Sequence, residues 1–139
     1  MKALRSPASR ALAILLTALF FATLATGAAQ ASADRPTAAV QQMATIMHRL
    51  KHFPSPQGKQ ELQAIIDDRA SSDNARILAT AMMNLQHKAM ADDKARLKGI
   101  MDDEGAPSHE RELAAIIYHL DHRPSSADKQ KLQAMMPAK

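Results

Sequence analysis

Histidine is the residue type whose spacing in this 139-residue chain most readily suggests chemistry. His48 and His52 stand four residues apart, so on a helix the two imidazoles would share a face and could hold a metal ion. Met43 and Met47 precede them at helical spacing and would add thioether sulfurs, which suit copper(I). His48 and His52 are therefore the candidate ligands of one hypothesis, in which the chain is a small metal-binding protein.

A second set of histidines, His52, His87 and His122, recurs every 35 residues. We expect a helix to end at each of them, where a hydrogen-bonding or cationic side chain can satisfy free carbonyl groups. Packed helices lie about 8–10 Å apart, and metal ligands lie about 2 Å from the ion. A stack of three helices would thus keep these histidines too far apart to share a metal. The sequence predicts a capping role for them.

Catalytic chemistry has little support. The acidic runs Asp67-Asp68, Asp92-Asp93 and Asp102-Asp103-Glu104 lack the alternating oxygen ligands and central glycine of a calcium loop. Adjacent aspartates also diverge on a helix, so we interpret these runs as solvated charge. The chain has no cysteine, no Gly-x-Ser-x-Gly motif and no glycine-rich phosphate-binding loop. We expect a protein that is not an enzyme and uses no cofactor.

The elements that carry these residues repeat along the chain. Residues 44–66 and 114–136 share 11 identities in 23 positions, without a gap. A fixed period of 20–50 residues is typical of stacked supersecondary units. The period of 35 divides the chain into units of about 38–72, 73–107 and 108–137.

Each unit is predicted to contain two helices. In the first unit Val40, Met43 and Met47 recur at helical spacing, and Pro-Ser sequences then separate this helix from the next. The fold class is therefore all-α, with three stacked helical hairpins and six short helices. Residues 87–93 contain no Pro, Ser or Gly, so local propensity favours one long helix there. The repeat requires a turn near Met90, which we favour.

The N-terminal 33 residues resemble a secretory signal peptide rather than part of the fold. Basic residues precede an apolar run too short to span a membrane, and Ala-Ser-Ala predicts cleavage between Ala33 and Asp34. Residues 34–139 would then be a periplasmic or secreted helical domain, with no membrane association after cleavage. An uncleaved anchor is the alternative.

Removal of this segment also changes the charge. The whole chain carries 18 Lys and Arg against 14 Asp and Glu, and the segment beyond residue 33 carries 15 against 14. A nearly neutral domain offers no basic face to the phosphate backbone of nucleic acid. Its only aromatic residues are Phe53 and Tyr118, so it has few side chains on which nucleic-acid bases could stack. We expect no nucleic-acid partner.

The leading hypothesis is a non-enzymatic protein-interaction module, such as a periplasmic stress chaperone or adaptor that binds a protein partner or an unfolded client. Positions that differ between units are the ones expected to recognise a partner. The candidate partner-binding residues are His48, Met83, Tyr118, Phe53 and Met90. The alternative is that these side chains cover the seams between hairpins.

Overall fold

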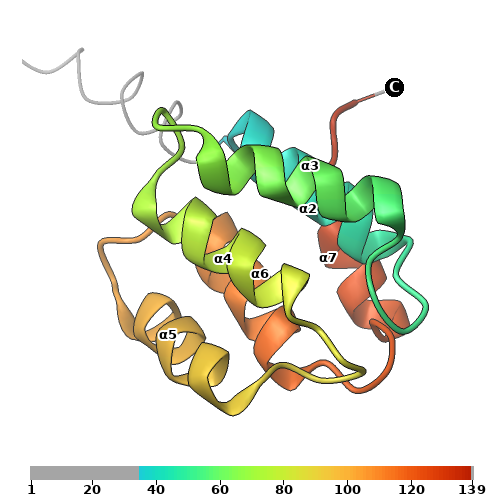
Figure 1. Ribbon diagram of the computed structural model, residues 1–139. Coiled ribbons are helices and arrows are strands. Elements are labelled where there is room, and N and C mark those ends of the chain that lie inside the picture. The colour runs from blue at the N-terminus through green and yellow to red at the C-terminus, as the bar shows by residue number, and fades with distance from the viewer. Residues whose placement is uncertain (1–34, 139) are drawn as a thin grey trace, which may run out of the picture.

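The computed structural model describes residues 35–138, which form six helices and no β-strand. In chain order they are α2 (Ala38–His48), α3 (Pro56–Asp67), α4 (Asp73–Met83), α5 (Ala91–Asp102), α6 (Ser108–His119) and α7 (Ser126–Met135) (Figure 1). The predicted all-α class with six helices is confirmed. The predicted signal peptide lies outside the described residues. Within 35–138, no helix has the length and apolar character needed to cross a bilayer.

Side-chain caps fix where most of the helices begin. The hydroxyl oxygens of Thr37, Ser55, Ser72 and Ser125 each accept a hydrogen bond from a backbone amide three residues ahead, at 3.0–3.3 Å. Such caps satisfy amides that have no partner within the helix. At α5 the capping position is occupied by Met90, which provides no side-chain cap.

The connection between α4 and α5 is a turn, as favoured from the 35-residue period. α4 ends at Met83 and α5 begins at Ala91. Leu85 and Ala89 within this connection are buried in the core. The turn brings α5 back into contact with α4, and Leu97 and Ile100 of α5 are buried.

The core is aliphatic and rich in methionine, as the composition suggests. The largest fully buried side chains come from all six helices and one connection: Val40, Met43, Met47, Pro54, Leu62, Leu78, Met82, Leu97, Leu113, Ile117 and Leu132. A short helix with one apolar stripe is stable only when that stripe is covered by neighbours. The three hairpins therefore depend on one another for their burial.

The hairpins close on themselves instead of forming an open stack. α3 packs against α4, α5 packs against α6, and α7 returns to pack against α2, while α2, α4 and α6 contact one another in the middle. Figure 1 shows α7 beside α2 although they are the last and first described helices. The sequence predicted three stacked hairpins without specifying their arrangement; the contact between α7 and α2 closes the set and covers the apolar stripes of both helices.

Candidate functional site

Three connections between helices lie together at one end of the molecule, here called the loop end (Figure 1). They are residues 49–55, 84–90 and 120–125. The backbone amide of His122 donates a hydrogen bond of 2.7 Å to the carbonyl of His87. Lys88 Nζ also lies 3.5 Å from Asp121 Oδ1. Closure of the hairpins thus brings residues from all three units to one place.

The recurring histidines meet at the loop end. Ring centroids lie 5.2 Å apart for His52 and His87, 5.0 Å for His87 and His122, and 6.1 Å for His52 and His122. The prediction that they could not converge is wrong, because it assumed a linear stack. The capping prediction is also wrong, because the first helices end at His48, Met83 and His119. The three histidines lie in the connections, three or four residues further on.

Two of these histidines have a backbone conformation that non-glycine residues rarely adopt. φ is 71° at His87 and 64° at His122. Around His122, the amide of Arg123 donates to the carbonyl of Asp121 at 2.8 Å, which closes a three-residue turn. A turn of this size with positive φ at its centre is strained. Glycine or asparagine would adopt the positive φ more easily than histidine does.

Asp121 is the carboxylate of this cluster. Its Oδ1 lies 2.7 Å from Nδ1 of His122. The hydrogen bond from His122 and the charge of Lys88 lower the pKa of Asp121 below its ordinary value. The lowered pKa favours the ionised carboxylate, which accepts a hydrogen bond from the exposed ring of His122.

The pair of histidines predicted as metal ligands is not assembled on one helix. α2 ends at His48, so His52 lies in the following connection rather than one turn further along the same face. Met47 is fully buried in the core. Within residues 35–138, no three His or acidic side chains lie as they stand in a geometry that could hold a metal ion.

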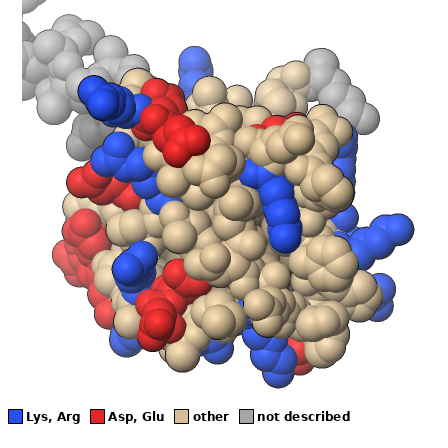
Figure 2. Space-filling view, viewed as in Figure 1, with Lys and Arg blue, Asp and Glu red and all other residues tan. Residues whose placement is uncertain are grey.

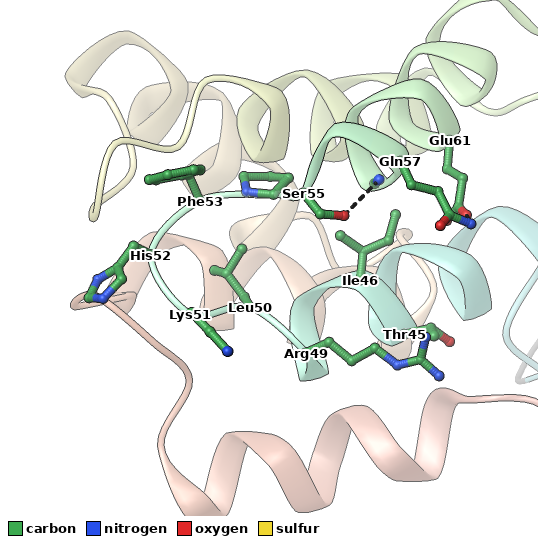
Figure 3. Close-up of a pocket in the computed structure, with 12 residues that line it drawn as sticks. Thr45, Ile46, Arg49, Leu50, Lys51, His52, Phe53, Ser55, Gln57 and Glu61 are labelled. Carbon is green, nitrogen blue, oxygen red and sulfur yellow. Dashed lines mark hydrogen bonds between the residues drawn. The ribbon is translucent and has the colours of Figure 1, made fainter.

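A groove opens beside His52 between α2 and α3. Its volume is about 580 Å³, with Ile46, Leu50 and Pro54 as apolar lining and Arg49, Lys51 and Glu61 among the polar lining. Figure 3 shows Phe53 at one end of the groove, and Glu61 and Gln57 on α3 at the other. Phe53 is 60% exposed, which is unusual for a side chain of this size.

The other predicted partner-binding residues lie near the same end of the molecule. His48 and Met83 are the last residues of α2 and α4, and Tyr118 is the penultimate residue of α6. Met83 and Tyr118 are partly buried and pack against the core. Met90, after the second connection, is 45% exposed. Lys94 Nζ lies 5.1 Å from the centre of the Tyr118 ring.

Two carboxylates are buried, contrary to the interpretation of acidic residues as solvated charge. Asp93 accepts a hydrogen bond of 3.0 Å from the side-chain amide of Asn84, which fixes the turn before α5. Glu110, which sequence reasoning did not single out, accepts from Ser72 Oγ at 3.2 Å and from Asn74 Nδ2 at 2.9 Å. Both carboxylates are occupied by structural hydrogen bonds, so neither suggests acid–base catalysis.

Surface charge gives no sign of a polyanionic partner on the face shown in Figure 2. Asp and Glu gather on its left side with basic residues among them, and uncharged residues fill much of its centre.

Comparison of the chain with known protein families, with characterised proteins and with solved structures finds no match.

Proposed function

We propose that this chain is a non-enzymatic protein-interaction module that binds an apolar side chain of a partner in the groove between α2 and α3. The observation that carries the proposal is Phe53, which is 60% exposed beside a groove of about 580 Å³. An aromatic side chain left in water next to an apolar groove is a typical anchor for a protein partner.

The groove suits an extended or unfolded segment. Its lining combines apolar contact from Ile46 and Leu50 with charged groups from Arg49, Lys51 and Glu61. Apolar contact tolerates varied side chains, while mixed charge on the rim selects no single sign of partner. The client of such a site is a protein segment with exposed aliphatic or aromatic residues.

The cellular setting is part of the same proposal. A cleaved signal peptide over residues 1–33 would deliver the domain to the periplasm or the cell exterior. Three copies of one 35-residue unit account for the regular helix starts at residues 38, 73 and 108. A domain that is stabilised by closure, with no cysteine in the whole chain, does not depend on the redox state of its compartment.

The test replaces Phe53 with Ser and measures suppression of aggregation of an unfolded client. Burial of a phenylalanine side chain contributes about 1.5–3 kcal/mol, so client affinity should fall roughly 10- to 100-fold. Phe53→Leu should retain most of the activity, because an apolar anchor remains. Gln133→Ala, which changes an exposed residue of α7 that does not line the groove, serves as the control.

Thermal unfolding separates a binding effect from a folding effect. The melting temperature of Phe53→Ser should match that of the wild type, since the side chain is mostly exposed. The proposal fails if the wild type suppresses no aggregation, or if Phe53→Ser and Gln133→Ala reduce the suppression equally.

A further inference from the structure

We infer that His52, His87 and His122 bind a divalent transition-metal ion such as Zn²⁺ or Cu²⁺ at the loop end. The three rings come from connections that are 35 residues apart in sequence, yet every pair of rings is in contact. The residues next to these histidines differ between the units. The preceding residues are Lys51, Gln86 and Asp121, and the following residues are Phe53, Lys88 and Arg123. Of these three adjacent positions, only the central one has the same residue, histidine, in every unit.

The spacing of the rings matches that of a three-histidine metal site. A ring nitrogen that binds Zn²⁺ lies about 2.0–2.1 Å from the ion, so the ring centroid lies about 3.2 Å from it. Tetrahedral angles between three such ligands place the centroids about 5.2 Å apart. The observed separations are 5.0, 5.2 and 6.1 Å. Two pairs already have the required spacing and the third is within about 1 Å of it.

The ring planes meet at 54–82°, and among residues 35–138 no three such side chains form a metal-holding group as they stand. Rotation about the bond between Cβ and the ring turns the nitrogens while the centroid, which lies close to that axis, stays in place. This torsion has a broad energy profile in histidine. His52, His87 and His122 are all exposed, so no core packing opposes the rotation. Metal binding therefore requires the exposed rings to reorient through their side-chain torsions, including the one between Cα and Cβ.

Asp121 provides the supporting contact that metal-binding histidines commonly have. Its Oδ1 lies 2.7 Å from Nδ1 of His122. When Nδ1 donates to this carboxylate, Nε2 is the nitrogen left to bind the metal. Asp121 also places a negative charge beside the cluster, and it is paired with Lys88 at 3.5 Å. Lys51 and Arg123 flank the cluster in sequence and oppose a cation, so we expect moderate affinity.

Backbone strain indicates that the imidazoles are present for a reason other than folding. His87 and His122 have φ values of 71° and 64°, which glycine and asparagine adopt more readily. Strain of this kind concentrates at ligand-binding sites. An imidazole-only ligand set favours zinc, copper or nickel over magnesium and calcium, and Cu²⁺ should bind more tightly than Zn²⁺.

The experiment is calorimetric titration of the purified protein with ZnCl₂ and with CuCl₂, with MgCl₂ as the negative control. The wild type should bind one Zn²⁺ or one Cu²⁺ per chain. His52→Gln, His87→Asn and His122→Asn should each lower the affinity at least tenfold, and Asp121→Asn should lower it about tenfold. The matched control is His119→Asn, which removes an exposed histidine at the end of α6 and should leave binding unchanged.

Two further measurements keep the inference distinct from folding and from the proposed groove. The melting temperatures of His87→Asn and His122→Asn without metal should stay at or above the wild-type value, because asparagine relieves the strained φ. Phe53→Ser should bind metal normally, since its side chain is not a ligand.

The inference is overturned if the wild type binds no stoichiometric Zn²⁺ or Cu²⁺, or if binding survives in His87→Asn and His122→Asn. It is equally overturned if His119→Asn removes the binding. A large fall in the metal-free melting temperature of His87→Asn or His122→Asn would assign the cluster a structural role.

Discussion

Closure of the three hairpins predicts that equivalent leucines on α3, α5 and α7 contribute equally to stability. Leu62, Leu97 and Leu132 are each fully buried. Replacement of such a leucine by alanine costs about 2.7–5 kcal/mol, which combines lost burial with the cavity left behind. A domain of this size has a total stability of about 5–15 kcal/mol, so each loss is a large share of it.

The measurement is urea unfolding followed by far-ultraviolet circular dichroism for Leu62→Ala, Leu97→Ala and Leu132→Ala. All three should lower the midpoint by similar amounts with little change in the slope of the transition. Gln133→Ala is the matched control on α7, because Gln133 is exposed and its loss should change the free energy of unfolding by at most about 0.5 kcal/mol.

The decisive comparison involves Leu132, on the last helix. In an open stack α7 would lack a neighbour on one side, and truncation there would cost much less than at the central leucine. A cost below about 1 kcal/mol for Leu132→Ala, alongside full costs at Leu62 and Leu97, would refute the closed arrangement.

Three further predictions concern individual positions. Gly99→Ala should raise the free energy of unfolding by about 0.5–1 kcal/mol in urea, because Gly99 is in the interior of α5 with open space around it. Gly58→Ala should raise it by less, because the added methyl group would meet neighbouring side-chain atoms at 3.3 Å. Met90→Ser should raise the free energy of unfolding by about 1 kcal/mol by supplying the cap that α5 lacks, and a decrease would contradict this. Because the pKa of Asp121 is lowered in the folded state, its carboxylate stabilises the fold at pH values above the ordinary aspartate pKa, and this contribution is lost as the pH falls through the folded-state pKa. In His122→Asn, carboxyl NMR titration should show the pKa of Asp121 rising toward about 3.9. An unchanged pKa would contradict the role given to His122.

Local features were readable from the sequence because their causes are local. Helical spacing of apolar residues and Pro-Ser connections predict the helices, and in the structure Thr37, Ser55 and Ser125 cap three of them. The turn before α5 required a second line of reasoning. There the 35-residue period agreed with the structure and local propensity did not, because the turn lets α5 pack against α4 with Leu97 and Ile100 buried.

The arrangement of the hairpins was not readable in the same way. Spacing along the chain indicates which residues share a helix face, but it carries no information on the angle between successive hairpins. A linear stack and a closed set are therefore equally compatible with the pattern, and the choice between them decides whether the recurring histidines meet. The positive φ at His87 and His122 had only a weak signal, because histidine adopts positive φ more often than most non-glycine residues but still does so seldom.

The candidate groove was only partly predictable. Phe53 was singled out because it differs from Lys88 and Arg123 at the matching positions. Its high exposure, and the groove between α2 and α3 beside it, depend on how Ile46 and Pro54 pack. His48, Met83 and Tyr118 lie at or next to the C-terminal ends of α2, α4 and α6. The partial burial of Met83 and Tyr118 is compatible both with covering the contact between hairpins and with binding a partner.

The central claim is that the three hairpins close so that their connections meet at the histidines. Nuclear Overhauser spectroscopy between the imidazole protons of His52, His87 and His122 tests it most directly. Closure predicts cross-peaks for all three ring pairs, including His52 with His122, which are 70 residues apart in sequence and have ring centroids 6.1 Å apart. Cross-peaks confined to neighbouring units, with none between His52 and His122, would contradict the closed arrangement.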